Sequence, residues 1–454
     1  MLVRLIVKNL FSFNEATEFN LLPGRFSRMP YHVQEIGDVE LLKLSVIYGA
    51  NGAGKSNLIK ALALLADYLR SGQLPVEFLL ETFKFEPDSR KKDVYIGVEF
   101  IKNEIPFYYG ITLNQGIVVE EELYYTGAGK EPDVLLFRRT DRVGARQLKL
   151  EFSPAVLRDP EAALFPEFLE NEVLERNQPV LFHMASRKNI VFEPYKWAHT
   201  WFTQDFVPIL PATRPTGLPI LLEKNESFRK FSCAVMEAFD TGISEIKVDT
   251  IPVEEFFGQE GSQHAERITA QLRAAPEKVQ PLVTEHEEIT FVLRDDKAVA
   301  KRLYFEHDMD GGAHRFTAAE ESDGTRRLLD YLPAFYAAIH GQRVYMIDEI
   351  ERSIHPLLIK ELIQKFSHDE NTKGQLIFST HESNLLDQEI FRPDEIWFAE
   401  KDKGATKLSP LSDYREHHTI DIRKGYLNGR YSAIPFLANL RDLNWDVHAE
   451  AATI

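Results

Sequence analysis

Apolar residues gather into short runs at both ends of the chain, and polar turns separate these runs from segments of helical spacing. Near the N-terminus, Leu44 to Tyr48 predict a buried strand, and Asn57 to Leu69 predict a helix that ends near Gly72. Farther along, Val344 to Ile347 and Gln375 to Thr380 are apolar runs of the same kind. We therefore expect the C-terminal part of the chain to return to the sheet that the N-terminal part begins.

Alternation of apolar and polar residues marks a different kind of strand. It runs from Val94 to Phe100 and again from Ile117 to Leu123, after a turn at Asn114 to Gly116. Consecutive strands joined by short turns predict an antiparallel β-meander beside the parallel sheet.

The middle of the chain has another character. Between residues 155 and 290, prolines interrupt helical pieces, and aromatic residues cluster, for example at Trp197, Trp201 and Phe206. We therefore divide the chain into units 1–154, 155–290 and 291–454. The aromatic cluster favours a packed core, although a dimerisation arm or a partner-docking surface stays open. The predicted fold class is α/β, with a mixed sheet and an antiparallel β-meander, interrupted by a mainly helical insertion.

Composition limits the classes of function. The chain has 454 residues, a formal net charge of −17 and a single cysteine, Cys233. It has no apolar run long enough to span a membrane, and the strand-like start from Met1 to Leu10 is not a signal peptide. With the lone cysteine, these features predict a cytoplasmic protein. The acidic charge argues against non-specific coating of DNA, because such binding depends on Lys and Arg, but a local basic groove stays open.

Residues 49–56 read GANGAGKS and match the phosphate-binding pattern G-x-x-x-x-G-K-[ST] between a predicted strand and a predicted helix. Glycines let backbone N–H groups converge on phosphate oxygens, and the helix N-terminus adds partial positive charge. Lys55 is expected to reach the β- and γ-phosphates, and the Ser56 hydroxyl to bind Mg²⁺. We call residues 49–56 the phosphate loop. The expected nucleotide-binding residues here are Gly49, Asn51, Gly52, Ala53, Gly54, Lys55, Ser56 and Asn57.

Two carboxylates follow the predicted strand Val344 to Ile347. In proteins with a phosphate loop, acidic residues at the carboxyl end of a neighbouring strand lie beside Mg²⁺. Because side chains alternate along a strand, Asp348 and Glu349 should point in different directions. We assign Asp348 to the metal and Glu349 to the general base that activates water.

Together with these motifs, further segments resemble the head domain of ABC-type ATPases. The similarity is to AAA-domain proteins of bacterial anti-phage and abortive-infection systems, which are related to SMC-like heads. Glu321 to Thr325, before an apolar helix from Leu328 to Ile339, resemble the ABC signature, although a simple helix cap explains the same residues. His381 resembles the switch histidine that hydrogen-bonds the γ-phosphate. Ser353 to Pro356 resemble the loop that lines the dimer interface.

The C-terminal part resembles this subgroup, and not ABC transporters, in three segments, namely Asp394 to Asp402, Gly404 to Thr406 and Lys424 to Pro435. Two positions depart from the family pattern. Residues 82–87 contain no glutamine where many ABC enzymes have one beside Mg²⁺, and Phe11 stands where SMC-like heads often place an arginine.

The resemblance implies a composite site with the cofactors ATP and Mg²⁺. Ser322 and Gly324 would contact the γ-phosphate bound by a second subunit, and His381 would act with Glu349 in catalysis. A homodimer or higher oligomer would thus close on the nucleotide, and hydrolysis would loosen it.

The resemblance also suggests what such a switch controls. Related bacterial defence ATPases commonly work with a separately encoded toxin or nuclease effector, often of the Toprim or HNH type, and a phage-encoded trigger is compatible with that role. Two alternatives stay open. One is an SMC-like DNA-repair head that clamps DNA directly, which the many prolines of residues 155–290 disfavour because they prevent a long coiled coil. The other is a stand-alone nucleotide phosphohydrolase.

Overall fold

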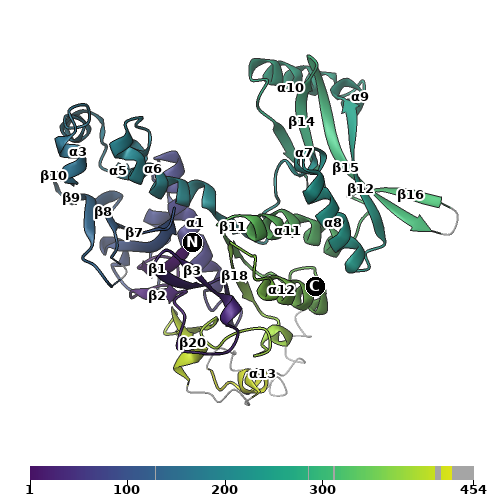
Figure 1. Cartoon of the computed structure of the whole chain (residues 1–454). Helices are drawn as coiled ribbons and strands as arrows, with labels where there is room; N and C mark the ends of the chain where they lie inside the picture. Colours follow the sequence, from purple (N-terminus) through teal and green to yellow (C-terminus); the bar gives the residue numbers. More distant parts are fainter. Residues whose placement is uncertain (128, 285, 310–311, 415–420, 432–454) are drawn as a thin grey trace, which may run out of the picture.

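Two lobes rise from a common base and diverge from each other (Figure 1). The computed structural model of the chain describes residues 1–127, 129–284, 286–309, 312–414 and 421–431. The base holds a central sheet, one lobe holds the β-meander, and the other lobe, residues 218–317, is called the arm below. Within the described ranges, no helix has the length and apolar character needed to cross a membrane.

The central sheet combines strands from both ends of the chain. Its order is β11-β17-β18-β5-β19-β20, with all neighbours parallel except β19 and β20. Every residue of β5 is buried, because the strand has neighbours on both edges and helices on both faces. The expected return of the C-terminal part to this sheet is confirmed. The strands are β5 (Leu44–Gly49), β11 (Phe206–Ile209), β17 (Val344–Ile347), β18 (Gln375–Thr380), β19 (Ile396–Asp402) and β20 (Ala405–Pro410).

Helices cover both faces of the central sheet. On one face, α1 (Lys55–Ser71) packs against Ile47 and Met346; on the other, α11 (Asp323–His340) and α12 (Pro356–His368) pack against side chains of opposite orientation. Helix α1 ends where the sequence predicts, because Gly72 adopts the left-handed conformation with φ of +67° and closes the last turn.

The β-meander is a seven-stranded antiparallel sheet in the order β10-β9-β8-β7-β6-β1-β2. Helix α1 lies between it and the central sheet, so one apolar core joins both. The rings of Trp201 and Phe100 stack at 4.5 Å, and Tyr195, Trp201 and Phe202 are fully buried, which confirms that these aromatic residues form a core. The strands are β1 (Leu2–Lys8), β2 (Thr17–Asn20), β6 (Val94–Lys102), β7 (Ile105–Asn114), β8 (Ile117–Tyr125), β9 (Val134–Arg142) and β10 (Ala145–Phe152).

Short helices complete this lobe. They are α2 (Glu77–Leu80), α3 (Pro154–Arg158), α4 (Phe165–Phe168), α5 (Val180–Ala185) and α6 (Glu193–Thr200). A separate two-stranded ribbon consists of β3 (Val33–Ile36) and β4 (Val39–Leu42), and α13 (Ile422–Leu427) lies in the base.

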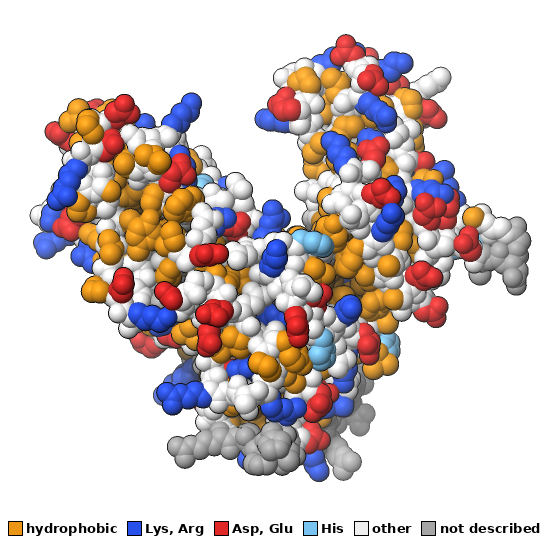
Figure 2. Space-filling view, viewed as in Figure 1, with side chains coloured by type: hydrophobic (Ala, Val, Ile, Leu, Met, Phe, Trp, Pro, Cys, Tyr) orange, Lys and Arg blue, Asp and Glu red, His pale blue; other side chains and the backbone are white. Residues whose placement is uncertain are grey.

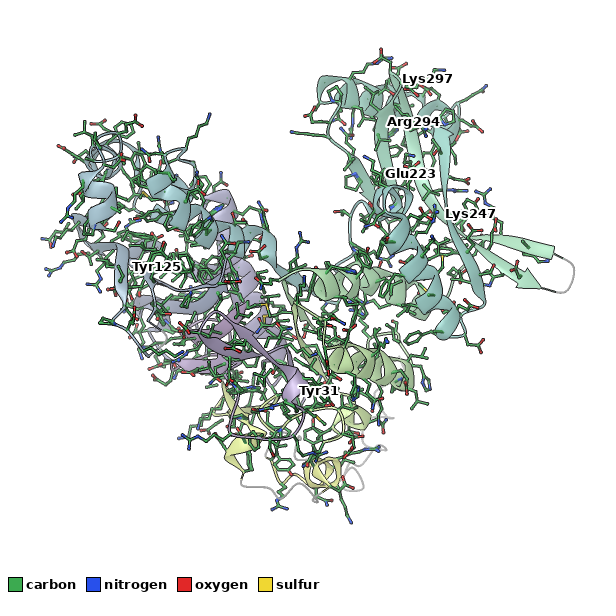
Figure 3. All side chains as sticks on the ribbon, viewed as in Figure 1. Tyr31, Tyr125, Glu223, Lys247, Arg294 and Lys297 are labelled. Atoms are coloured by element: carbon green, nitrogen blue, oxygen red, sulfur yellow. The ribbon has the colours of Figure 1, made fainter. Side chains whose placement is uncertain are left out.

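The arm is an antiparallel sheet with its own small core, in the order β12-β15-β14-β13, and β16 pairs with β15. Figure 3 shows Arg294 and Lys297 at the end of the arm that is farthest from the base. Its strands are β12 (Ile243–Pro252), β13 (Gln280–Val283), β14 (Glu288–Arg294), β15 (Lys297–Met309) and β16 (Gly312–Thr317). Its helices are α7 (Leu218–Lys224), α8 (Glu226–Ala238), α9 (Val253–Phe257) and α10 (Ser262–Ala274).

The predicted fold class is confirmed: the fold is α/β, with a mixed central sheet and an antiparallel β-meander, and a region rich in helices interrupts the chain between β5 and the later strands of the central sheet. Residues 155–290 contribute to the meander lobe, to the central sheet through β11 and to the arm, and residue 290 lies inside β14. The division at 154 and 290 stays a prediction about functional units.

Candidate nucleotide-binding site

The phosphate loop joins the carboxyl end of β5 to the start of α1. Gly52 and Gly54 have φ of +75° and +104°, a backbone conformation that is costly for any residue with a Cβ atom. Space is also short at Gly54, where a Cβ atom would overlap Thr406 Oγ1 and lie 2.7 Å from Ser12 Oγ. At Gly54, conformation and packing therefore both require glycine.

The hydroxyl groups of Thr406 and Ser12 form hydrogen bonds that support the phosphate loop and the start of α1. Thr406 Oγ1, on β20, lies 2.7 Å from both Ala53 O and Ser12 Oγ. Asn57 Nδ2 donates to Ser12 Oγ at 2.8 Å, which ties the first turn of α1 to the same group. The antiparallel strand β20 and the N-terminal loop thus fix the shape of the phosphate loop.

Lys55 is buried at the start of α1, and its ammonium group bridges two motifs. Nζ donates to Gly49 O at 2.8 Å and to Ala50 O at 3.2 Å. It also lies 3.1 Å from His381 Nε2, at the end of β18, which is the neighbour of β5. The structure therefore brings the predicted switch histidine directly to the predicted phosphate-binding lysine.

The electrostatics of this contact follow from burial and from three nearby carboxylates. Burial lowers the pKa of Lys55 to about 8, and the carboxylates of Asp348, Glu351 and Glu349 oppose this shift. Burial also lowers the pKa of His381, and the positive charge of Lys55 lowers it further. The histidine is thus favoured in its neutral form beside a charged lysine.

Asp348 and Glu349 lie at the same sheet edge. Asp348 is buried, and the hydroxyl of Ser379 donates to its Oδ1 at 2.5 Å. The same hydroxyl accepts the backbone N–H of Glu349 at 2.9 Å. Glu349 has a φ of +50°, which costs about 1–3 kcal/mol for a residue other than glycine.

The oxygen atoms at this edge suit Mg²⁺. Neither the Ser56 hydroxyl nor the Glu349 carboxylate has a hydrogen-bond partner among the residues that the structure describes. Those residues also include no group of three or more His, Cys, Asp or Glu that could hold a metal by themselves. Mg²⁺ is commonly held by one or two protein oxygens together with phosphate oxygens and water, so Ser56 and Asp348 fit the ion in the presence of a nucleotide.

Ser322 and Gly324 lie apart from these groups. Ser322 is exposed and caps α11, since its Oγ accepts the backbone N–H of Thr325 at 3.1 Å. A Cβ atom at Gly324 would lie 2.7 Å from Ser353 O, so the signature-like residues and the expected interface loop form one surface. Among the described contacts, no hydrogen bond joins Ser322 or Gly324 to the phosphate loop.

Sequence reasoning missed four residues that shape the site. Ser379 lies two positions before His381, and Glu351 lies two positions after Glu349. Their positions near the ends of predicted strands could therefore have indicated a role in the site. Thr406 lies in the distinctive segment Gly404 to Thr406, but its role beside the phosphate loop was not predicted, because its contact with Ser12 spans 394 positions of the chain. Of the distinctive C-terminal segment, Ser432 to Pro435 lie outside the described residues.

Solved structures with a related outline are SMC head domains. The chain is similar to the "SMC head domain from Thermotoga maritima", with 13% identity, 90% of this chain and 98% of that chain covered, and a TM-score of 0.38. For an "SmcHead bound to the C-winged helix domain of ScpA", the identity is 12%, the match covers 91% of this chain and 99% of that chain, and the TM-score is 0.41. A third structure is an Smc head domain with an extended coiled coil, bound to the C-terminal domain of ScpA and derived from Pyrococcus furiosus. Its identity to this chain is 11%, the match covers 91% of this chain and 97% of that chain, and the TM-score is 0.40. No curated protein matches the chain.

A family model matches residues 44–172 and 244–387, and its description reads "AAA domain, putative AbiEii toxin, Type IV TA system". The matched residues include the phosphate loop, the pair Asp348 and Glu349, and His381. Since the match covers more than half of the chain, the protein belongs to this AAA-domain family.

Proposed function

We propose that the chain binds and hydrolyses ATP with Mg²⁺ and dimerises around the nucleotide. One observation carries this proposal: Lys55, His381 and the pair Asp348 and Glu349 come from three separate segments of the chain and meet at one edge of the central sheet. If these charged groups had only a structural role, neither a phosphate loop beside them nor a Glu349 carboxylate without a hydrogen-bond partner among the described residues would be needed. The arrangement provides both a place for phosphate groups and a base for water.

Each group has a role that its position supports. The phosphate loop and Lys55 hold the phosphates, and bound Mg²⁺, held by Ser56 and Asp348, neutralises charge on them. Glu349 takes the proton of the water that attacks the γ-phosphate. His381 donates a hydrogen bond to the γ-phosphate and thereby reports its presence.

The dimer follows from the position of Ser322 and Gly324. Ser322 and Ser353 are exposed, Gly324 is half-buried beside Ser353, and among the described contacts no hydrogen bond joins Ser322 or Gly324 to the phosphate loop of their own chain. In the proposed dimer, the surface that these residues form covers the nucleotide of the second subunit, and the N-terminus of α11 attracts the γ-phosphate. Loss of that phosphate removes these contacts, so the subunits separate after hydrolysis.

We further propose that the dimer is a sensor and scaffold in an anti-phage defence complex, where it controls a separate toxin or nuclease effector. The family description, which names a toxin of type IV toxin–antitoxin systems, supports an association with toxin systems. On the face that Figure 2 shows, Lys and Arg are mixed with Asp and Glu and do not gather into a basic stripe. That distribution favours control of a protein effector over direct clamping of DNA.

ATP binding and hydrolysis by purified variants test the enzymatic proposal. Lys55→Ala should weaken ATP binding at least about tenfold, and Glu349→Gln should keep binding but slow hydrolysis at least about 100-fold. Lys60→Ala, at an exposed position of the same helix, is the matched control and should behave as the wild type. Unchanged ATP binding in Lys55→Ala would show that the phosphate loop does not bind the nucleotide.

Plaque formation tests the defence role. Bacteria that carry the chain with its neighbouring genes should resist some phages, and the Lys55→Ala variant should lose that resistance. Equal protection by Lys55→Ala and wild type would show that the nucleotide site does not control defence.

A further inference from the structure

A third carboxylate, that of Glu351, lies beside the proposed catalytic groups. Its Oε1 accepts the backbone N–H of His381 at 2.7 Å. Its Oε2 is buried and has no hydrogen-bond partner among the residues that the structure describes. Most buried polar atoms in proteins are paired, so an unpaired carboxylate oxygen next to a nucleotide site calls for an explanation.

Glu351 is one of several links between the ends of two neighbouring strands. The turn after β17 and the end of β18 are joined by hydrogen bonds from Glu349 N to Ser379 Oγ at 2.9 Å and from Ile350 N to Ser379 O at 3.2 Å. The bond from His381 N to Glu351 Oε1 completes this set. Of the three bonds, it is the one that fixes the histidine, whose imidazole lies 3.1 Å from the ammonium group of Lys55.

The negative charge of Glu351 also acts on both Lys55 and His381. Burial lowers the pKa of Lys55 and of His381, and Glu351 acts against both shifts. For His381, its effect comes before those of Glu349 and Asp348. The carboxylate therefore acts on the charge of the imidazole as well as on the peptide group of His381.

We propose that Glu351 is a positioning residue, which holds the peptide group of His381 so that the imidazole stays beside Lys55 and the γ-phosphate of a bound nucleotide. This inference rests on the proposed ATPase function. Glu351 does not contact the phosphate loop through any hydrogen bond within the described residues, so its removal should affect turnover more than nucleotide binding.

Hydrogen exchange resolved to the single backbone amide of His381 tests the contact itself, without nucleotide. Glu351→Ala should speed exchange at the His381 amide, because the acceptor is lost, and Glu351→Gln should restore slow exchange through its amide oxygen. Glu382→Ala is the matched control: Glu382 accepts the backbone N–H of Asn384 at 2.8 Å, so its removal should leave exchange at His381 unchanged. Wild-type exchange in Glu351→Ala would overturn the proposal.

Steady-state kinetics test the consequence. Glu351→Ala should lower kcat at least about tenfold with KM within about threefold of wild type, and Glu351→Gln should recover most of kcat. Glu382→Ala should keep wild-type kcat. Normal kcat in Glu351→Ala, or a Glu351→Gln variant that exchanges slowly but turns over as poorly as Glu351→Ala, would overturn the positioning role. Absence of ATP hydrolysis in the wild type would instead refute the proposed function and leave the exchange result standing.

Discussion

Asp330, on α11, is a carboxyl group whose ionisation the fold opposes. Burial raises its pKa from 3.8 to about 6, although the positive charges of Arg214, Arg327 and Arg326 act in the opposite direction and Glu288 reinforces the rise. The folded state thus binds more protons than the unfolded state between these two pKa values. Stability that is present at low pH is therefore lost as the pH rises from about 4 to about 6.

The variant Asp330→Asn should remove this loss. Its free energy of unfolding should increase relative to that of wild type as the pH rises, by on the order of 1 kcal/mol between pH 5 and pH 7. Urea denaturation at several pH values measures this difference, with Asp38→Asn, at an exposed turn, as the control. A difference that stays constant with pH would show that the pKa of Asp330 in the folded state is not raised.

At the level of residues, the sequence predicted most accurately those site residues whose chemical type and position along the chain indicate the same role. The structure places Lys55, His381, Asp348 and Glu349 together because each stands at the carboxyl end of a predicted strand or at the start of the adjacent helix. The supporting role of the Thr406 hydroxyl was not predicted, because a hydrogen bond between a strand and a loop that are far apart in the chain leaves no periodic pattern.

At the level of elements, the phosphate loop depends on its packing against β20. Gly54→Ala should destabilise the protein by about 1–3 kcal/mol more than Gly52→Ala, because both positions need a positive φ but only Gly54 faces Thr406 and Ser12. A Cβ atom at Gly52 meets nothing within 4 Å. Denaturant unfolding of the two variants provides the comparison. Equal losses would mean that β20 does not constrain the loop.

The arm is tied to the signature-bearing helix α11 by a buried arginine. Arg327 donates to Thr213 O at 3.0 Å and to Leu210 O at 3.4 Å, in the segment that leads from β11 into the arm, and its Nε donates to Tyr331 at 3.1 Å. Arg327→Ala should lower the free energy of unfolding by about 2–4 kcal/mol, since two partly buried carbonyl groups each lose a charged donor and a buried side chain is removed. Thermal and urea unfolding measure this loss, and wild-type stability would show that the joint does not depend on Arg327.

The sequence pattern predicted the elements of the base better than those of the arm. The strands of the central sheet are buried on both faces and read as apolar runs, whereas β13 is exposed along most of its length. The arm has only a small apolar core, so its strands carry a weak signal in the sequence and residues 155–290 read as mainly helical.

At the level of the whole molecule, the proposed catalytic groups and the signature-like surface occupy separate places. Lys55, Glu349 and His381 lie at the carboxyl ends of strands of the central sheet, while Ser322 and Gly324 lie at the start of α11 beside Ser353. Under the proposed function, these are two parts of a nucleotide site, and no hydrogen bond among the described residues joins Ser322 or Gly324 to the phosphate loop. Two chains related by a twofold axis would complete two equivalent sites.

Mixing two inactive variants tests whether each nucleotide site is formed by two subunits. Lys55→Ala lacks a working phosphate loop but keeps Ser322, and Ser322→Arg has a blocked signature surface but keeps Lys55. Each alone should hydrolyse ATP poorly. An equal mixture should recover up to about a quarter of the wild-type rate, because half of the dimers are mixed and each holds one complete site. If Ser322→Arg alone is fully active, or if the mixture is no more active than its components, the composite site is contradicted.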